Sequence, residues 1–173
     1  MSAIPDLDSY WVVQGRFLAG AYPGALDEEK ARQKIRALIN AGITTFIDLT
    51  RPGDIYSPYQ TQLREEADKF QIKVEWLNFP IADYEVPSME LMKQILDTVD
   101  QRLEDGHRVY VHCVGGIGRT GTVVGCYLAH HGYSGEEALV QLEFLRKEAA
   151  SWSHRSPESD FQIDFVRKWP ADH

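Results

Sequence analysis

The chain has 173 residues, of which 43% are hydrophobic and 25% are charged, and its formal net charge is -8. This composition excludes disordered, fibrous and collagen-like proteins and predicts a soluble globular protein. The negative charge argues against nucleic acid or an anionic membrane as the main partner, because both attract clustered Lys and Arg. The length is enough for one hydrophobic core, so we predict a single domain over residues 1–173.

Targeting signals and cysteine content predict a cytoplasmic location. The first eight residues contain no basic segment followed by an apolar stretch, and no apolar run is long enough to span a bilayer. The two cysteines, Cys113 and Cys126, are too few for a disulfide scaffold and fit a reducing compartment. We expect a cytoplasmic monomer that binds neither nucleic acid nor a membrane and that keeps a free thiol for chemistry.

Short apolar segments alternate with helical patterns over the first two thirds of the chain. Four segments are bounded by Gly, Pro or polar residues and predict strands: 16–19, 43–49, 74–79 and 108–113. A helix is expected from the cap Asp27 to Gly42, a less regular one after Pro58, and the clearest one between Ser88 and Gly106.

Three more helical stretches follow the last predicted strand. The first covers residues 119–131, the second opens with the capping box Ser134 to Glu137, and the third opens at Ser156 and Pro157. Strands that alternate with helices predict an α/β fold with a mostly parallel central sheet, flanked by helices and followed by a helical C-terminal part.

The segment from His112 to Gly121 reads His-Cys-Val-Gly-Gly-Ile-Gly-Arg-Thr-Gly and lies between a predicted strand and a predicted helix. α/β folds bind ligands at this edge of the sheet. The glycines allow a tight turn that points N–H groups inward, and a helix N-terminus attracts anions. The same field favours thiolate over thiol at Cys113. The segment therefore predicts a nucleophile at the base of a phosphate-binding loop formed by Val114, Gly115, Gly116, Ile117 and Gly118.

Arg119 and Thr120 complete this segment. A guanidinium can donate two parallel hydrogen bonds to phosphate oxygens, and Thr120 can hydrogen-bond the cysteine sulfur as it leaves. The competing interpretation is a Gly-rich turn with a buried cysteine and a surface arginine. A Walker loop is excluded because no Lys-Ser or Lys-Thr pair ends the glycine run.

This segment resembles the His-Cys-x5-Arg-Ser/Thr signature of the protein tyrosine phosphatase superfamily. The chain length, the late signature and the helical tail are similar to the compact dual-specificity branch, with a resemblance over about residues 11–169. The resemblance implies hydrolysis of phosphate monoesters through a phospho-cysteine intermediate, without a metal or other cofactor. The implied partner is a phosphorylated protein or peptide that carries phosphotyrosine, and also phosphoserine or phosphothreonine. His112 is expected to order the loop.

The resemblance also implies a carboxylic acid on a separate loop, which protonates the leaving oxygen and later activates water. Asp83 fits this role, because Asp-x-x-x-Pro follows a predicted strand and resembles the acid loop of the family. Glu85 and then Asp54 are the rival carboxylates, and a solvated loop aspartate is the competing interpretation of Asp83.

Other residues have weaker patterns. Gln162 resembles a water-positioning glutamine of some tyrosine phosphatases, although Glu158 stands where a second glutamine is expected, and a surface helix explains it equally well. Cys126 is expected to be buried in packing rather than linked to Cys113. No metal site is expected, because the spacing of three histidines relative to the cysteines does not match a zinc site: His130, His131 and His154.

Three other functions remain open from the sequence. They are a phosphate-binding pseudophosphatase, sulfur transfer on a related cysteine loop, and hydrolysis of phosphoinositides or other non-protein phosphates. The five loop residues between Cys113 and Arg119 include no Lys or Arg, which favours a singly phosphorylated aryl substrate over a polyphosphorylated one. Arg51 or Arg155 could supply the missing positive charge from elsewhere.

Overall fold

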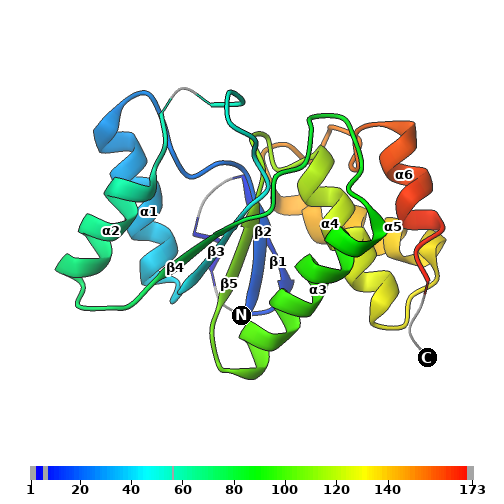
Figure 1. Ribbon diagram of the computed structural model, residues 1–173, viewed down its shortest axis with the longest axis horizontal. Helices are drawn as coiled ribbons and strands as arrows, with labels where there is room; N and C mark the ends of the chain where they lie inside the picture. Colours follow the sequence, from blue (N-terminus) through cyan, green and yellow to red (C-terminus); the bar gives the residue numbers. More distant parts are fainter. Residues whose placement is uncertain (1–2, 6–7, 56, 171–173) are drawn as a thin grey trace.

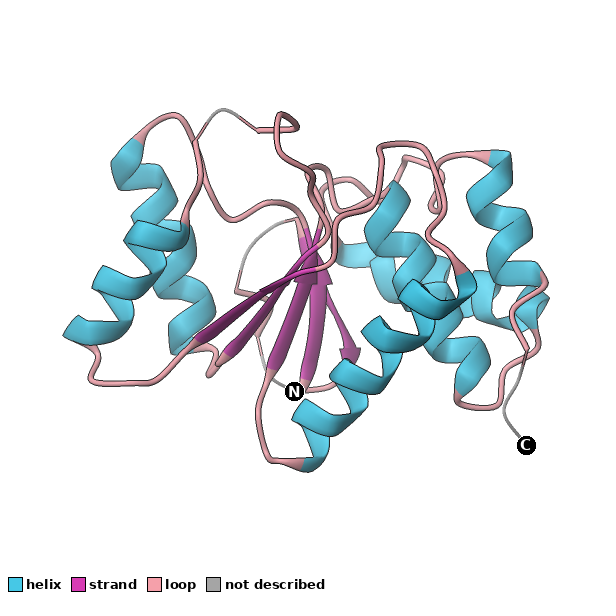
Figure 2. Ribbon diagram, viewed as in Figure 1, coloured by secondary structure: helices cyan, strands magenta, loops and turns pink. Residues whose placement is uncertain are grey.

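The computed structural model describes residues 3–5, 8–55 and 57–170. Its centre is a five-stranded sheet with the strand order β1-β2-β5-β3-β4, covered by helices on both faces (Figures 1 and 2). Four neighbouring strands are parallel, and β1 pairs antiparallel with β2 at one edge. The strands are β1 (Ser9–Val13), β2 (Phe17–Gly20), β3 (Thr45–Asp48), β4 (Glu75–Asn78) and β5 (Val109–His112). The predicted α/β fold with a mostly parallel sheet is confirmed.

The two faces of the sheet have separate apolar clusters, because side chains alternate along each strand. In β2, Leu18 faces the cluster made with α1 and α2, while Phe17 and Ala19 face the cluster made with the remaining helices. Figure 1 shows the first pair of helices on one side of the sheet and α3 to α6 on the other. The helices are α1 (Glu28–Asn40), α2 (Gln60–Lys69), α3 (Met89–Glu104), α4 (Gly118–His130), α5 (Gly135–Leu145) and α6 (Asp160–Arg167), with a short 3-10 turn at Arg146–Glu148.

Local caps fix where most helices begin. Asp27 accepts a hydrogen bond from the Lys30 N–H at the start of α1, and Ser88 caps α3 in the same way. The predicted capping box at Ser134 is present on α5. Each cap satisfies an N–H that the first helical turn leaves unpaired.

Two parts of the sequence interpretation were wrong or incomplete. The last helix begins at Asp160 instead of at Ser156, because Ser159 and Gln162 form its capping box and satisfy its first N–H groups. Strand β1 was not predicted, although Tyr-Trp-Val-Val has strand-forming residues. The predicted extent of the single domain includes residues outside the described ranges and stays a prediction.

A buried carboxylate joins α1 to α2. Glu66 is 1% exposed and accepts hydrogen bonds from Arg32, Arg36 and Lys69. These contacts hold the pKa of Glu66 at about 2, chiefly through the Arg36 hydrogen bond, although burial acts in the opposite direction. The pair of helices is therefore fixed by charge as well as by apolar packing.

Candidate active site

The loop after β5 begins with a buried thiol, and its backbone N–H groups have no acceptor in the described part of the chain. Cys113 is 3% exposed, and the chain turns from it through residues 114–117 into α4. In the described part of the chain, the N–H groups of residues 114–119 donate to no backbone or side-chain acceptor, and Ile117 provides no side-chain cap for α4. Unpaired N–H groups at the start of a thirteen-residue helix attract an anion.

Close backbone contact with β2 holds this loop in shape. Gly116 has φ of 71°, and a Cβ there would lie 2.5 Å from the carbonyl carbon of Gly20. The neighbouring Val114 carbonyl accepts a hydrogen bond of 2.9 Å from the Tyr22 N–H. A side chain at position 116 would therefore push the loop away from the sheet.

The guanidinium of Arg119, the second residue of α4, contacts two carboxylates. Its Nη1 donates to Asp54 Oδ2 at 2.5 Å and to the Ile81 carbonyl at 2.9 Å, while Nη2 lies 3.2 Å from Asp83 Oδ1. Arg119 is 1% exposed and its Nε has no partner among the described residues. Because the two Nη atoms contact Asp54, Ile81 and Asp83, the Nε–H remains as a donor for an oxyanion bound in the loop.

Burial and ion pairing act in opposite directions on these charges. Burial lowers the pKa of Arg119, but the hydrogen bond to Asp54 and the electrostatic effects of Cys113 and then Asp83 outweigh it, so the pKa is raised. Burial raises the pKa of Asp54, but the Arg51 N–H and Arg119 outweigh it, so the pKa is lowered. Arg119 and Asp54 are therefore both charged at neutral pH.

Of the three carboxylates considered, the structure brings Asp83 and Asp54 to Arg119. Asp83 lies in the loop of residues 80–87 that connects β4 to α3, which we call the acid loop, and its side chain is 56% exposed. An exposed carboxylate beside the phosphate loop can reach a leaving oxygen. Asp54 is less accessible, at 20%, and has a stronger contact with the guanidinium. Glu85 is exposed and has no described side-chain contact with Arg119.

Comparison with known proteins identifies the family of the chain. The family model described as "PTP-SAK: Swiss Army Knife protein, DSP-PTPase phosphatase domain" matches residues 8–167. The chain belongs to this family. The resemblance to the compact dual-specificity branch of the protein tyrosine phosphatase superfamily is thereby confirmed.

Several relatives of this phosphatase domain are named tyrosine phosphatases. Protein tyrosine phosphatase domain-containing protein 1 of Mus musculus is 33% identical over 133 residues, which are 73% of this chain and 17% of the relative. A protein of Arabidopsis thaliana named phosphatidylinositol 3,4,5-trisphosphate 3-phosphatase and protein-tyrosine-phosphatase PTEN1 is 35% identical over 138 residues, or 78% of this chain and 31% of the relative. The chain thus spans less than a third of the length of both.

A solved structure gives the same fold at lower identity. Tk-PTP in its active form superposes with a TM-score of 0.73 and 23% identity, and the match covers 94% of this chain and 95% of the other. At this identity the likeness shows the fold, and the chemistry is argued from the site itself.

The His112 ring connects the start of the phosphate loop to Tyr59 through hydrogen bonds. Its Nδ1 lies 3.2 Å from the Cys113 carbonyl, which can only accept, so Nδ1 carries the proton. Its Nε2 then accepts from the Tyr59 hydroxyl at 2.8 Å. Complete burial lowers the pKa of His112, so the ring is neutral and fixed in one tautomer. Tyr59 was not predicted, because it lies 53 residues away in the sequence.

The remaining predicted residues lie close to the loop or in the core. Thr120 is buried, with its Oγ1 3.4 Å from the Gly20 carbonyl, so its contact with the sulfur stays a prediction. Gln162 is buried beside Gly118: a Cβ added to Gly118 would lie 3.1 Å from Gln162 Oε1. Cys126 is buried and free, and burial raises its pKa well above the usual value.

Among the described residues, no group of three or more His, Cys, Asp or Glu side chains could hold a metal ion. No helix in the described ranges is long and apolar enough to cross a membrane.

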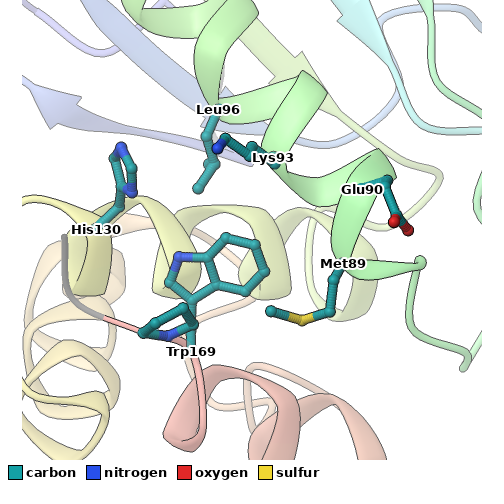
Figure 3. A pocket seen from close by; sticks show the side chains of 7 residues that line it. Met89, Glu90, Lys93, Leu96, His130 and Trp169 are labelled. Atoms are coloured by element: carbon teal, nitrogen blue, oxygen red, sulfur yellow. The ribbon is translucent and has the colours of Figure 1, made fainter.

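Two cavities differ in their relation to the loop. One, of about 220 Å³, borders it at Val114 and includes Leu26, Ile55 and Asp54. Another, of about 250 Å³, shares no lining residue with the phosphate loop or the acid loop (Figure 3). It is lined by Met89, Glu90, Lys93, Leu96, His130, Trp169 and Pro170.

Proposed function

We propose that the chain hydrolyses phosphate monoesters, foremost phosphotyrosine in proteins or peptides and also phosphoserine or phosphothreonine, through a phospho-cysteine at Cys113. The observation that carries this proposal is the set of unpaired N–H groups in the loop that follows the buried Cys113, together with the partner-free Nε of Arg119 at the end of that loop. Together these donors match a phosphoryl dianion and the charge that develops on its oxygens during transfer.

The first step forms the phospho-enzyme. The Cys113 thiolate attacks phosphorus, the bond from phosphorus to the ester oxygen breaks, and the leaving oxygen takes the proton of Asp83. The loop N–H groups and Arg119 stabilise the transferring phosphoryl group. A leaving alkoxide would be too basic to depart without this proton.

The second step regenerates the thiolate. Asp83, now a carboxylate, removes a proton from water, and the resulting oxygen attacks phosphorus as the bond from phosphorus to sulfur breaks. Thr120 donates a hydrogen bond to the departing sulfur. Inorganic phosphate then leaves, and Asp83 is again protonated for the next cycle.

The surroundings of the loop favour a singly phosphorylated aryl group. The cavity beside Val114 includes no Lys or Arg among its lining residues, and most of its walls are apolar or aromatic. Of the two arginines that could supply extra charge, Arg155 pairs with Asp160 at 2.9 Å and Arg51 lines a different cavity. Additional phosphates would therefore find few cations, while an aryl ring would find apolar contacts.

Replacement of the nucleophile tests the reaction. Cys113→Ser should remove turnover of an aryl phosphate, while binding of the same ester is largely retained, because the donors of the loop remain. Wild-type protein that binds the ester without hydrolysing it would instead indicate a pseudophosphatase. Substantial hydrolysis by Cys113→Ser would refute the phospho-cysteine mechanism.

The name of the Arabidopsis relative makes phosphoinositides the second candidate substrate class. A comparison at fixed ionic strength should give phosphotyrosine peptides a higher kcat/KM than phosphoinositides or inositol polyphosphates. The reverse order would show that the substrate was wrongly inferred from the loop and its cavity.

A further inference from the structure

The acid loop is held on both sides of Asp83. On the N-terminal side, Arg119 donates to the Ile81 carbonyl at 2.9 Å. On the C-terminal side, Ser159 Oγ donates to the Tyr84 carbonyl at 2.9 Å, and Gln162 Nε2 donates to the Glu85 carbonyl at 3.2 Å. Figure 1 shows this loop, which precedes α3, passing the first turn of α6. The first turn of a distant helix therefore restrains the two residues that follow the proposed acid.

These two donors belong to the capping box of α6. Ser159 Oγ accepts from the Gln162 N–H, and Gln162 Oε1 accepts from the Ser159 and Glu158 N–H groups at 3.1 and 3.0 Å. The acceptors of both side chains thus satisfy the helix terminus. The hydroxyl proton of Ser159 and one of the two amide protons of Gln162 are donated to the acid loop.

A second capping box in the same chain lacks this outward connection. On α5, Glu137 has no side-chain donor, and Ser134 Oγ donates to Glu137 Oε2 at 2.7 Å. A capping box needs only acceptors at its third helical residue, so glutamate is sufficient there. The glutamine of α6 supplies a proton that capping alone does not require.

The acid loop needs such restraint because it includes a strained residue. Tyr84 has φ of 60°, a left-handed conformation that non-glycine residues rarely adopt unless their surroundings hold them. Tyr84 directly follows Asp83, and its carbonyl is the one that Ser159 binds. Release of that carbonyl would allow the backbone to relax and change the direction of the Asp83 side chain.

We propose that Ser159 and Gln162 are positioning residues that latch the acid loop, so that Asp83 is held beside Arg119 for proton transfer. The inference rests on the proposed function, because it assigns these residues to the step in which Asp83 acts. It differs from a water-positioning role for Gln162, which would affect only the second step. The two roles can be separated because kcat/KM reports formation of the phospho-enzyme, whereas kcat also includes its hydrolysis.

The test compares two leaving groups in two variants. Ser159→Ala removes one latch bond, and Gln162→Met removes the other with a neutral side chain of similar length, so that no charge is added beside Gly118. With phenyl phosphate, whose phenol is a poor leaving group, kcat/KM should fall about tenfold in each variant, the effect of one lost hydrogen bond to the acid loop. With nitrophenyl phosphate, whose phenol leaves with little help, the loss should be less than about twofold.

Ser134→Ala is the matched control, because it removes an equivalent N-cap from α5 without touching the acid loop. It should lower the melting temperature about as much as Ser159→Ala, with unchanged kcat/KM for both esters. Equal losses for the two esters in the α6 variants, or no loss, would overturn the latch. A fall in kcat at constant kcat/KM would overturn it in favour of water positioning. Wild-type protein inactive on both esters would refute the proposed function itself.

Discussion

Glu66 offers a quantitative test of how charge joins α1 to α2. Glu66→Gln keeps the size of the side chain and removes the charge that Arg32, Arg36 and Lys69 share. The variant should leave the active site intact, since α2 lies on the opposite face of the sheet from the helix that follows the phosphate loop. Its effect should therefore appear in the free energy of unfolding and not in catalysis.

The magnitude follows from the pKa. A fall from the usual 4.5 to about 2 corresponds to about 3 kcal/mol of stabilisation when the group is fully ionised. The side chains of Arg36 and Lys69 are 36% and 57% exposed, so solvent and salt reduce the value to about 1.5 kcal/mol. Because the folded-state pKa is lowered, this contribution is present above about pH 4.5 and is lost as the pH falls toward 2.

Urea unfolding followed by tryptophan fluorescence measures the difference. At about pH 7 the variant should be less stable than wild type by about 1.5 kcal/mol, and the difference should shrink as the pH falls toward about 2. Glu65→Gln is the control, because that carboxylate is 49% exposed and pairs with Arg32 alone among the described contacts, so it should cost less than about 0.5 kcal/mol. A difference for Glu66→Gln that is independent of pH would refute the electrostatic reasoning.

Three further predictions concern the active site. Asp83→Asn should lower kcat/KM by roughly 10²–10⁴-fold for phenyl phosphate and much less for nitrophenyl phosphate, while Glu85→Gln should leave both values nearly unchanged. A larger loss in Glu85→Gln than in Asp83→Asn would transfer the acid role to Glu85. Arg119→Lys keeps the charge but loses the planar fork, so kinetics with an aryl phosphate should be strongly impaired, and near-normal values would exclude bidentate binding. Mild peroxide should inactivate the enzyme, and added thiol should restore its activity. Mass spectrometry should show no disulfide between Cys113 and the buried Cys126, and such a disulfide would contradict the packing role of Cys126.

The fold and the phosphate loop could be predicted because their determinants are local. The strand before Cys113, the glycines after it and the helix that follows lie within one continuous segment. Asp83 could be proposed because the order of its loop and the phosphate loop, and the Asp-x-x-x-Pro pattern, resemble the acid loop of the family. The sheet itself follows from short apolar segments separated by amphipathic helices.

The partners of these residues depend on strand order, which the sequence does not state. Asp48 at the end of β3 lies opposite His112 at the end of β5, so the chain segments that follow them leave the sheet side by side. This pairing brings Asp54 to Arg119 from 65 residues away. It could not be derived from local patterns, because the same strands could be ordered in several ways. The contact of Ser159 with the acid loop could not be predicted for a related reason: its cap of α6 is local, but Tyr84 lies 75 residues away in the sequence.

The two carboxylates on Arg119 have a consequence for ligand selectivity. In the free protein they act as internal competitors for the guanidinium, so an incoming anion gains only the difference between its own interaction and theirs. A weakly charged anion such as a carboxylate offers the arginine little more than Asp54 already does. In the proposed mechanism, a phosphoryl dianion would also bind the unpaired N–H groups of the loop, to which neither aspartate is bonded. The proposed site would therefore discriminate against monoanions, at some cost in absolute affinity for phosphate.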